Sequence, residues 1–159
     1  MKEKVLSYLD DLKIPYEVTE HAPVLNMEEV EAVGLTKIGP VCKNLFLRDQ
    51  KGKRHFLVTA SEETQISLKD LGEKLGVKLS FASAERLQKY LGVSTGSVSP
   101  MGVLNDADHA VEVILDQKLQ GQPKLGVHPN ENTATVWLSF SNLQKALKKA
   151  GNDVKIMKL

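Results

Sequence analysis

The chain has 159 residues, about the size of one domain, which is long enough to bury most of its apolar surface in a single core. Its 21 Lys and Arg residues nearly balance its 20 Asp and Glu residues, and the net charge of +1 excludes a large basic surface that wraps long duplexes. Any nucleic-acid partner is therefore expected to bind at a small site. The single Cys42 excludes an intramolecular disulfide framework, and no CxxC motif or Cys/His cluster offers a structural zinc site.

The N-terminal stretch MKEKVLSYLDDLKIPYEV is interrupted by charges every few residues, which is atypical of a signal peptide or a membrane span. We therefore expect a cytoplasmic protein with no membrane partner. No long linker, low-complexity tract or internal repeat divides the chain, so residues 1–159 are predicted to form one domain.

The first half of the chain predicts helices with clear start signals, separated by short strands. An amphipathic helix is expected over residues 2–12, followed by a strand over 16–19. Asn26 is a candidate cap of a short helix, paired with Glu29 in a capping-box-like arrangement and ended by Gly34. Further predictions are a hairpin from 45–48 and 55–60, helices after Ser67 and Ser83, and a strand over 79–81.

The second half begins with the stretch GVSTGSVSPMGVLND, which has too many small residues and prolines for a regular element and predicts an ordered loop region. Strands are expected over residues 111–115, 124–127 and 133–138, then a closing helix capped by Ser141, and a last strand over 154–157. Because strands and helices do not alternate strictly, we predict the α+β class with a mixed sheet.

The stretch VCKNLFLR places a thiol, an ammonium and an amide where an apolar strand begins. Cys42 is either a nucleophile activated by the neighbouring lysine or an inert buried thiol, and the absence of a nearby histidine favours the inert reading. Lys43 and Asn44 are either solvated groups at a strand end or an anion-binding pair.

Two other segments carry candidate chemistry. The loop Gly96-Ser97-Val98-Ser99-Pro100 presents consecutive backbone N–H groups suited to a carbonyl oxygen or an oxyanion, although ordinary surface turns share this pattern. His128 precedes a proline that restricts its backbone and so aims its imidazole, although a lone histidine is often an ordinary surface residue. The other histidines, His21, His55 and His109, are assigned no catalytic role.

Taken in order and spacing, VCKNLFLR, GSVSPMGVLND and GVHPNENTATV resemble the YbaK and prolyl-tRNA synthetase editing-domain family, and more closely its free-standing ProX/PrdX branch. The resemblance covers nearly the whole chain, including HAPVLNMEEV and the closing helix. It implies a mostly antiparallel, barrel-like sheet flanked by helices. It also implies hydrolysis of mischarged Ala-tRNA(Pro), without metal, cofactor or covalent intermediate, in which a hydroxyl of the terminal ribose helps to activate the attacking water.

The same resemblance implies roles for individual residues. Lys43, with Asn44 beside it, would anchor the phosphate of the terminal nucleotide, and the backbone of the Gly96 loop would hold the aminoacyl ester. His128 would line the amino-acid pocket, with Leu25, Met27 and Val98 as further walls. Relatives are expected to have a threonine where this chain has Asn26, which bears on the shape of the pocket. The catalytic assignment therefore rests on Lys43 and Gly96, and substrate binding on Asn44, Ser97, Val98, Ser99, Pro100, His128, Leu25 and Met27.

The implied partner is the 3′ end of an aminoacyl-tRNA, with prolyl-tRNA synthetase or an elongation factor as further candidates. Two alternatives stay open: a deacylase for Cys-tRNA(Pro) or Ser-tRNA, and a non-catalytic module that binds an aminoacyl-tRNA or a synthetase. Lys145, Lys148 and Lys149 of the closing helix either contact backbone phosphates or form a solvated basic face.

Overall fold

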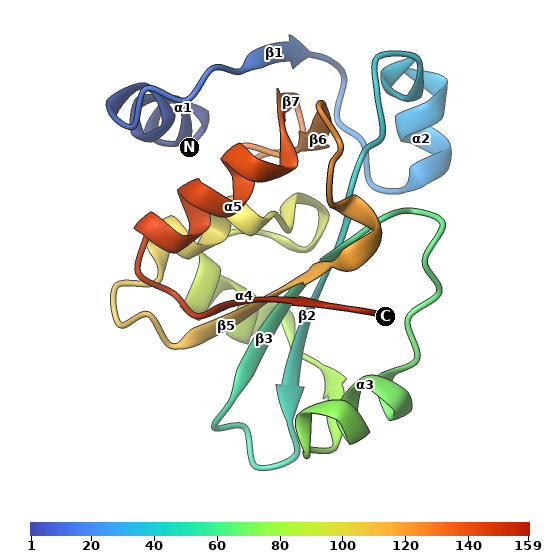
Figure 1. The fold of residues 1–159 in the computed structure, drawn as a ribbon, viewed down its shortest axis with the longest axis vertical. Helices are drawn as coiled ribbons and strands as arrows, with labels where there is room; N and C mark the ends of the chain where they lie inside the picture. Colours follow the sequence, from blue (N-terminus) through green and yellow to red (C-terminus); the bar gives the residue numbers. More distant parts are fainter.

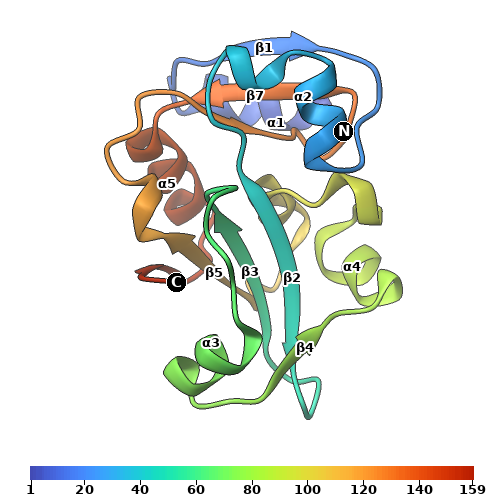
Figure 2. The ribbon, with the colours of Figure 1, turned by 90° about the vertical axis from the view of Figure 1, so that its right-hand side faces the viewer.

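The computed structural model describes residues 1–159 and contains two β-sheets surrounded by helices (Figure 1). The larger sheet has five strands in the order β4 (Leu79–Phe81), β2 (Lys43–Asp49), β3 (His55–Ala60), β5 (Val111–Asp116) and β8 (Val154–Met157). The smaller sheet has the order β1 (Glu17–Glu20), β7 (Ala134–Leu138) and β6 (Leu125–Val127). Figure 2 shows the small sheet lying across the end of the larger one at which β2 begins.

The larger sheet contains both antiparallel and parallel pairs, so it is a mixed sheet as the sequence predicts. The β2–β3, β2–β4, β1–β7 and β6–β7 pairs are antiparallel, whereas β5 lies parallel to both β3 and β8. The α+β class is confirmed. The strands form two open sheets rather than one closed barrel, and a single parallel bridge between Val41 and Gly126 joins them.

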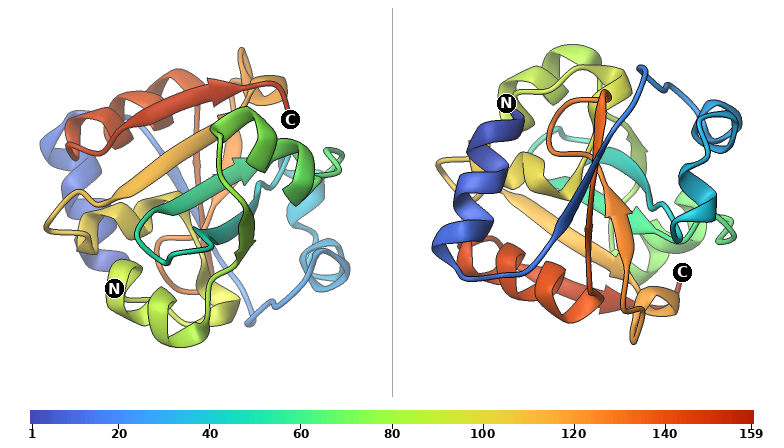
Figure 3. Two further views of the ribbon diagram at one scale, coloured as in Figure 1. Left: turned by 90° about the horizontal axis from the view of Figure 1, so that it is seen from below. Right: turned by 90° about the horizontal axis from the view of Figure 1, so that it is seen from above.

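The helices cover the sheets on several sides, as the two views of Figure 3 show for α1, α3 and α5. None of them combines the length and the apolarity that crossing a bilayer requires. The helices are α1 (Lys2–Asp11), α2 (Met27–Ala32), α3 (Leu68–Leu75), α4 (Ala84–Leu91) and α5 (Phe140–Lys149), with 3-10 turns at Leu35–Lys37, Thr95–Ser97, Pro100–Asn105 and Gln117–Leu119.

Strand alternation divides the core of the larger sheet between its two faces. On β3, Leu57 belongs to the main core with residues of α1, α4 and α5, whereas Phe56 and Val58 pack with Leu71 of α3 on the other face. A third, small cluster lies under α2, where Trp137 of β7 packs with Val24, Val30, Leu35 and Val41. This cluster matters for function because it supports one wall of the cleft described below.

Most helix starts are those that the sequence predicts, because side-chain oxygens of Asn26, Ser67 and Ser83 accept hydrogen bonds from backbone N–H groups three residues later. The cap predicted at Ser141 is wrong. The closing helix α5 begins at Phe140, and Ser139 caps it by accepting from the N–H of Asn142. The start lies two residues earlier because Phe140 is buried in the core, which places Ser141 on the exposed side of the first turn.

Candidate active site

A small cleft lies where the start of β2 meets α2, the Thr95–Ser97 turn and the end of β6. Its volume is about 170 Å³. The cleft is lined by most of the candidate site residues of the sequence analysis, which come from segments far apart in the chain. The lining residues are Val24, Leu25, Asn26, Met27, Val30, Val41, Cys42, Lys43, Asn44, Thr95, Gly96, Val98 and His128.

Backbone pairing between two distant segments brings Lys43 close to His128. The N–H of Cys42 donates to the carbonyl oxygen of Gly126 at 3.0 Å, and the N–H of Gly126 donates to that of Pro40 at 2.8 Å. The segment before β2 is thereby joined to β6, whose last residue precedes His128. The absence of a side chain at Gly126 leaves room for the Trp137 ring, because a β-carbon there would lie 2.8 Å from that ring.

Lys43 and Asn44 enter the cleft with unused donors. Lys43 forms no ion pair with any carboxylate of the chain. The hydroxyl of Thr59, opposite Asn44 on β3, donates to Asn44 Oδ1 at 2.7 Å. This bond fixes the amide orientation and leaves Asn44 Nδ2 to donate elsewhere. An ammonium and an amide N–H at one place are suited to an anionic oxygen.

His128 is held as a neutral ring with one free nitrogen. Its Nδ1 donates to the carbonyl oxygen of Ala134 at 3.2 Å, so Nε2 carries the lone pair and has no partner within the protein. Burial lowers the pKa of His128 below its usual 6.5, opposed by the bond to Ala134 and reinforced by the nearby His21. At neutral pH this side chain is a hydrogen-bond acceptor in the cleft.

His21 lies behind His128, with the two ring centroids 6.4 Å apart. Its Nδ1 lies 2.8 Å from the carbonyl oxygen of Ala22 and its Nε2 lies 2.8 Å from Thr135 Oγ1. The carbonyl only accepts, so Nδ1 carries the proton and the Thr135 hydroxyl donates to Nε2. His21 is not among the residues that line the cleft.

Gly96 forms a narrow part of the cleft wall. A β-carbon at this position would lie 2.6 Å from Leu25 Cδ2 and 3.4 Å from Asn132 Nδ2. Leu25 is 69% exposed, so its side chain covers the cleft without being enclosed by the core. The absence of a side chain at Gly96 therefore keeps this part of the cleft open.

Of the predicted loop, only Gly96 and Val98 line the cleft. Ser97, Ser99 and Pro100 are buried behind it. The Ser99 hydroxyl donates to the carbonyl oxygen of His128 and accepts from the N–H of Met101. Ser99 thus joins the loop to the His128 turn instead of facing a ligand.

Some lining residues were not predicted from the sequence. Nothing in the sequence distinguishes the valines at 24, 30 and 41 from ordinary core residues. Thr95 precedes Gly96, the residue to which the sequence analysis assigns a role, and carries no signal of its own. Asn26 both caps α2 and lines the cleft, with Oδ1 bonded to the N–H of Glu29 at 2.9 Å. Its dual position is consistent with the expectation that it influences the pocket shape.

Cys42 is an inert thiol that contributes only surface to the cleft. Its side chain is buried, and burial, with a smaller contribution from the charge of Asp116, raises the pKa of the thiol to about 12. A thiol in this state holds its proton at neutral pH and is a poor nucleophile.

Neither the cleft nor any other part of the chain contains a group of three or more His, Cys, Asp or Glu side chains placed to hold a metal ion.

Comparison with known proteins identifies the class to which this fold and cleft belong. The sequence profile of the aminoacyl-tRNA editing domain matches residues 21–146, a range that includes every residue of the cleft. The protein is therefore an aminoacyl-tRNA deacylase by class. The chain belongs to the aminoacyl-tRNA editing domain family.

Individual relatives cover nearly the full length of the chain. It is 49% identical over 159 residues to the prolyl-tRNA editing protein ProX of Acetoanaerobium sticklandii, covering 99% of this chain and 97% of the relative. It is 37% identical over 150 residues to the prolyl-tRNA synthetase associated domain-containing protein 1 of Mus musculus, covering 91% and 88%. A solved structure of a candidate trans-editing enzyme for prolyl tRNA synthetase has the same fold, with a TM-score of 0.74, 23% identity and coverage of 99% and 96%.

Proposed function

We propose that this protein hydrolyses the ester of mischarged Ala-tRNA(Pro), binding the 3′-terminal aminoacyl-adenosine in the cleft between β2, α2 and His128. The observation that carries the proposal is the gathering of Lys43, Gly96 and His128 around a cleft of about 170 Å³. The 49% identity to a prolyl-tRNA editing protein supports proline tRNA as the carrier.

Each group has a role that its environment supports. The ammonium of Lys43, free of carboxylate partners, binds the phosphate of the terminal nucleotide, and Asn44 Nδ2 donates beside it. The neutral His128 accepts from the α-ammonium group of the amino acid through Nε2. The backbone N–H groups around Gly96 donate to the ester carbonyl oxygen.

The reaction needs little beyond this positioning, because an aminoacyl ester is already activated. Water adds to the carbonyl carbon, negative charge develops on the carbonyl oxygen near the Gly96 loop, and the ribose oxygen leaves with a proton. A neighbouring hydroxyl of the terminal ribose helps to activate the water. Removal of one oxyanion donor costs about 2.7 to 4 kcal/mol in comparable enzymes, so the loop should contribute strongly to the rate.

Selectivity for alanine over proline follows from the size of the cleft. A hydrophobic pocket gains only about 1 to 3 kcal/mol per methylene group, so exclusion discriminates better than attraction. Leu25, Met27 and Val98 form apolar walls of the cleft, and Gly96 lies against Leu25. We propose that these walls admit a methyl side chain and exclude the pyrrolidine ring.

A serine ester is a second candidate because two amide groups face the cleft. Asn26 and Asn44 each have Oδ1 occupied by an internal donor, which leaves both Nδ2 groups to donate to a substrate hydroxyl. Deacylation rates for a panel of Ala-, Ser-, Cys- and Pro-tRNA(Pro) separate these possibilities. If the alanine ester is hydrolysed fastest, the proposal is supported. If the serine or cysteine ester is hydrolysed fastest, that amino acid replaces alanine as the proposed substrate.

A non-catalytic binding module predicts binding without turnover, and a Gly96 packed inward with no open cleft would have added support to that alternative. Gly96 instead lines the cleft. Binding of an aminoacyl-tRNA without turnover of any ester in the panel would revive this alternative.

A further inference from the structure

Two hydrogen bonds tie the Gly96–Pro100 loop and Met101, the residue that follows it, to the turn that carries His128. The Ser99 hydroxyl donates to the carbonyl oxygen of His128, and Asn130 Nδ2 donates to the carbonyl oxygen of Met101 at 3.1 Å. The first bond runs from the loop to the turn and the second runs from the turn to Met101. We call this pair of bonds the loop clamp.

Asn130 contributes to the clamp although its own side-chain oxygen is left without a partner. Its side chain is buried and its Oδ1 has no hydrogen-bond partner. Its backbone has φ of 64°, in the left-handed region that glycine adopts freely and asparagine adopts more readily than most other residues. Glycine would suit this backbone and would leave no buried oxygen unpaired, so the left-handed backbone alone does not favour asparagine over glycine here. The group that glycine lacks is the Nδ2 donor to Met101.

The position of the clamp links it to the chemistry of the cleft. Asn130 does not line the cleft, but the two segments that its side chain joins supply Gly96 and Val98 on one side and His128 on the other. These groups would bind opposite ends of one small aminoacyl ester. A change in their separation would misplace the ester carbonyl relative to the backbone donors.

We propose that Asn130 is a positioning residue, whose side-chain amide fixes the Gly96–Pro100 loop relative to His128 and so sets where the ester lies. The catalytic part of this inference rests on the function proposed above. Because the terminal phosphate binds at Lys43, outside the clamp, loss of the clamp should reduce kcat more than it weakens binding.

The main test is Asn130→Gly, a change that suits the left-handed backbone and removes the unpartnered oxygen along with the donor. The variant should fold with a Tm close to that of the wild type. Its kcat for the best ester of the panel should fall by about 10-fold to 100-fold with KM changed by less than about threefold, since small misplacements carry costs of this size. Retention of the wild-type kcat would overturn the proposal.

A matched control exists at Lys13, an exposed residue that also has a left-handed backbone, with φ of 58°. Lys13→Gly makes the same backbone change without touching the clamp, so its kcat should equal that of the wild type. Ser99→Ala removes the other bond of the clamp. Because the two bonds act as a unit, the double variant Ser99→Ala/Asn130→Gly should lose little more activity than the worse single variant, whereas additive losses would contradict a shared clamp.

Amide hydrogen exchange tests the clamp without any turnover. The N–H groups of Met101 and Gly102 donate to Ser99 Oγ and to the Ser99 carbonyl oxygen, at 3.1 and 3.0 Å. Both should exchange at least about tenfold faster in Asn130→Gly and at the wild-type rate in Lys13→Gly. Wild-type exchange at both amides in Asn130→Gly would overturn the proposal whatever its activity. If the wild type hydrolyses no aminoacyl ester, the proposed function fails, and the exchange rates still decide whether Asn130 holds the loop.

Discussion

His128 is the residue whose ionisation most directly sets the pH range of the proposed reaction. Its neutral ring accepts through Nε2, and burial lowers its pKa below 6.5. We expect kcat/KM to be constant above about pH 6.5 and to fall as the pH drops through the lower pKa of the folded protein, because protonation removes the lone pair. A rate that rises as the pH falls would contradict this role.

A variant at His21 should shift this profile. The nearby His21 helps to lower the pKa of His128, so His21→Gln should raise that pKa and move the acid limb to higher pH. The measurement is kcat/KM against pH for both proteins, after subtraction of the uncatalysed hydrolysis.

A second prediction at the residue scale concerns the width of the cleft between Gly96 and Leu25. A β-carbon in Gly96→Ala would displace Leu25 Cδ2, and because Leu25 is largely exposed the cost should appear in turnover rather than in Tm. We expect deacylation of Ala-tRNA(Pro) to fall by at least about tenfold, as for other losses of substrate placement.

The paired variant Leu25→Ala should raise the rate on Pro-tRNA(Pro) by opening the same wall. In combination with Gly96→Ala it should restore part of the alanine activity, because the atom that the β-carbon meets is gone. No restoration in the double variant would show that Gly96 acts through its backbone alone.

Cys42 provides a negative prediction. Its thiol holds a proton at neutral pH because burial raises the pKa to about 12. Cys42→Ala should therefore leave kcat/KM within about threefold of the wild type, whereas a thiolate nucleophile would be lost altogether. A collapse of activity in this variant, with an unchanged Tm, would point to cysteine-based hydrolysis.

At the scale of elements, the start of α5 shows what sequence patterns resolve and what they miss. Ser139 and Ser141 are both plausible caps, and only the burial of Phe140 between them decides in favour of Ser139. Ser139→Ala should lower the free energy of unfolding by about 0.5 to 2 kcal/mol, whereas Ser141→Ala should change it by less than about 0.5 kcal/mol. Urea denaturation of the two variants measures the difference, and equal losses would contradict the assignment.

Other elements follow from the sequence because their signals are local. The caps at Asn26, Ser67 and Ser83 lie within one turn of the bonds that they make, and the hairpin pairing of Arg48 with His55 follows from a short polar turn. The division into two sheets is not local. It depends on pairing between distant segments, such as that of β1 with β7, which come from opposite ends of the chain.

At the scale of the whole molecule, the candidate site is partly predictable for the same reason. Lys43, Gly96 and His128 stand out as residue types in unusual places, and the structure brings all three to one cleft. Ser99 and Asn130 join the loop that supplies Gly96 to the turn that carries His128, through bonds between segments that only the tertiary fold places together. No periodicity or spacing in the sequence marks such bonds.

Two interpretations remain open for the basic residues Lys145, Lys148 and Lys149: contact with the phosphates of the RNA backbone, or a solvated basic face. They lie on α5, and none forms an ion pair with a carboxylate of the chain. With a net charge of only +1, the molecule as a whole offers little general attraction for RNA. Recognition in the proposed function therefore depends mainly on the 3′-terminal nucleotide at the cleft.

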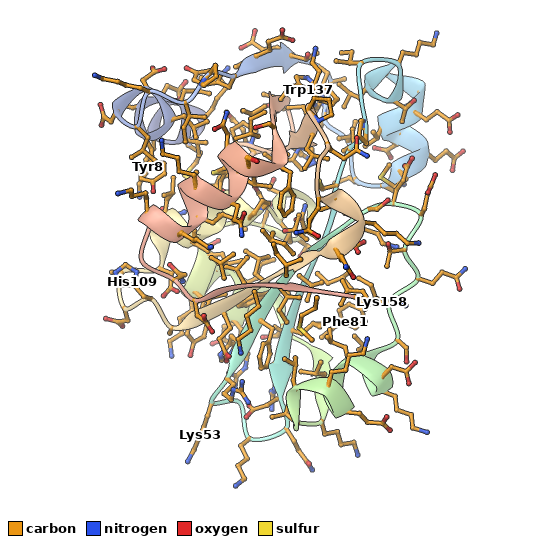
Figure 4. The ribbon with its side chains drawn as sticks, in the orientation of Figure 1. Tyr8, Lys53, Phe81, His109, Trp137 and Lys158 are labelled. Carbon is orange, nitrogen blue, oxygen red and sulfur yellow. The ribbon has the colours of Figure 1, made fainter.

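The most direct test of the account measures the deacylation rates of Ala-tRNA(Pro) and Pro-tRNA(Pro) in the presence of a chelator. The proteins are the wild type, Lys43→Ala and Lys53→Ala. Lys53 is a matched control because it is exposed at the tip of the β2–β3 hairpin, far from Trp137 and the small sheet (Figure 4).

The account predicts rapid loss of alanine and sparing of proline for the wild type and Lys53→Ala. In Lys43→Ala, kcat/KM should fall by about 10-fold to 150-fold, which corresponds to the roughly 1.5 to 3 kcal/mol of a hydrogen bond to a charged group. Equal rates for the two lysine variants, or hydrolysis of proline as fast as alanine, would contradict editing through this cleft.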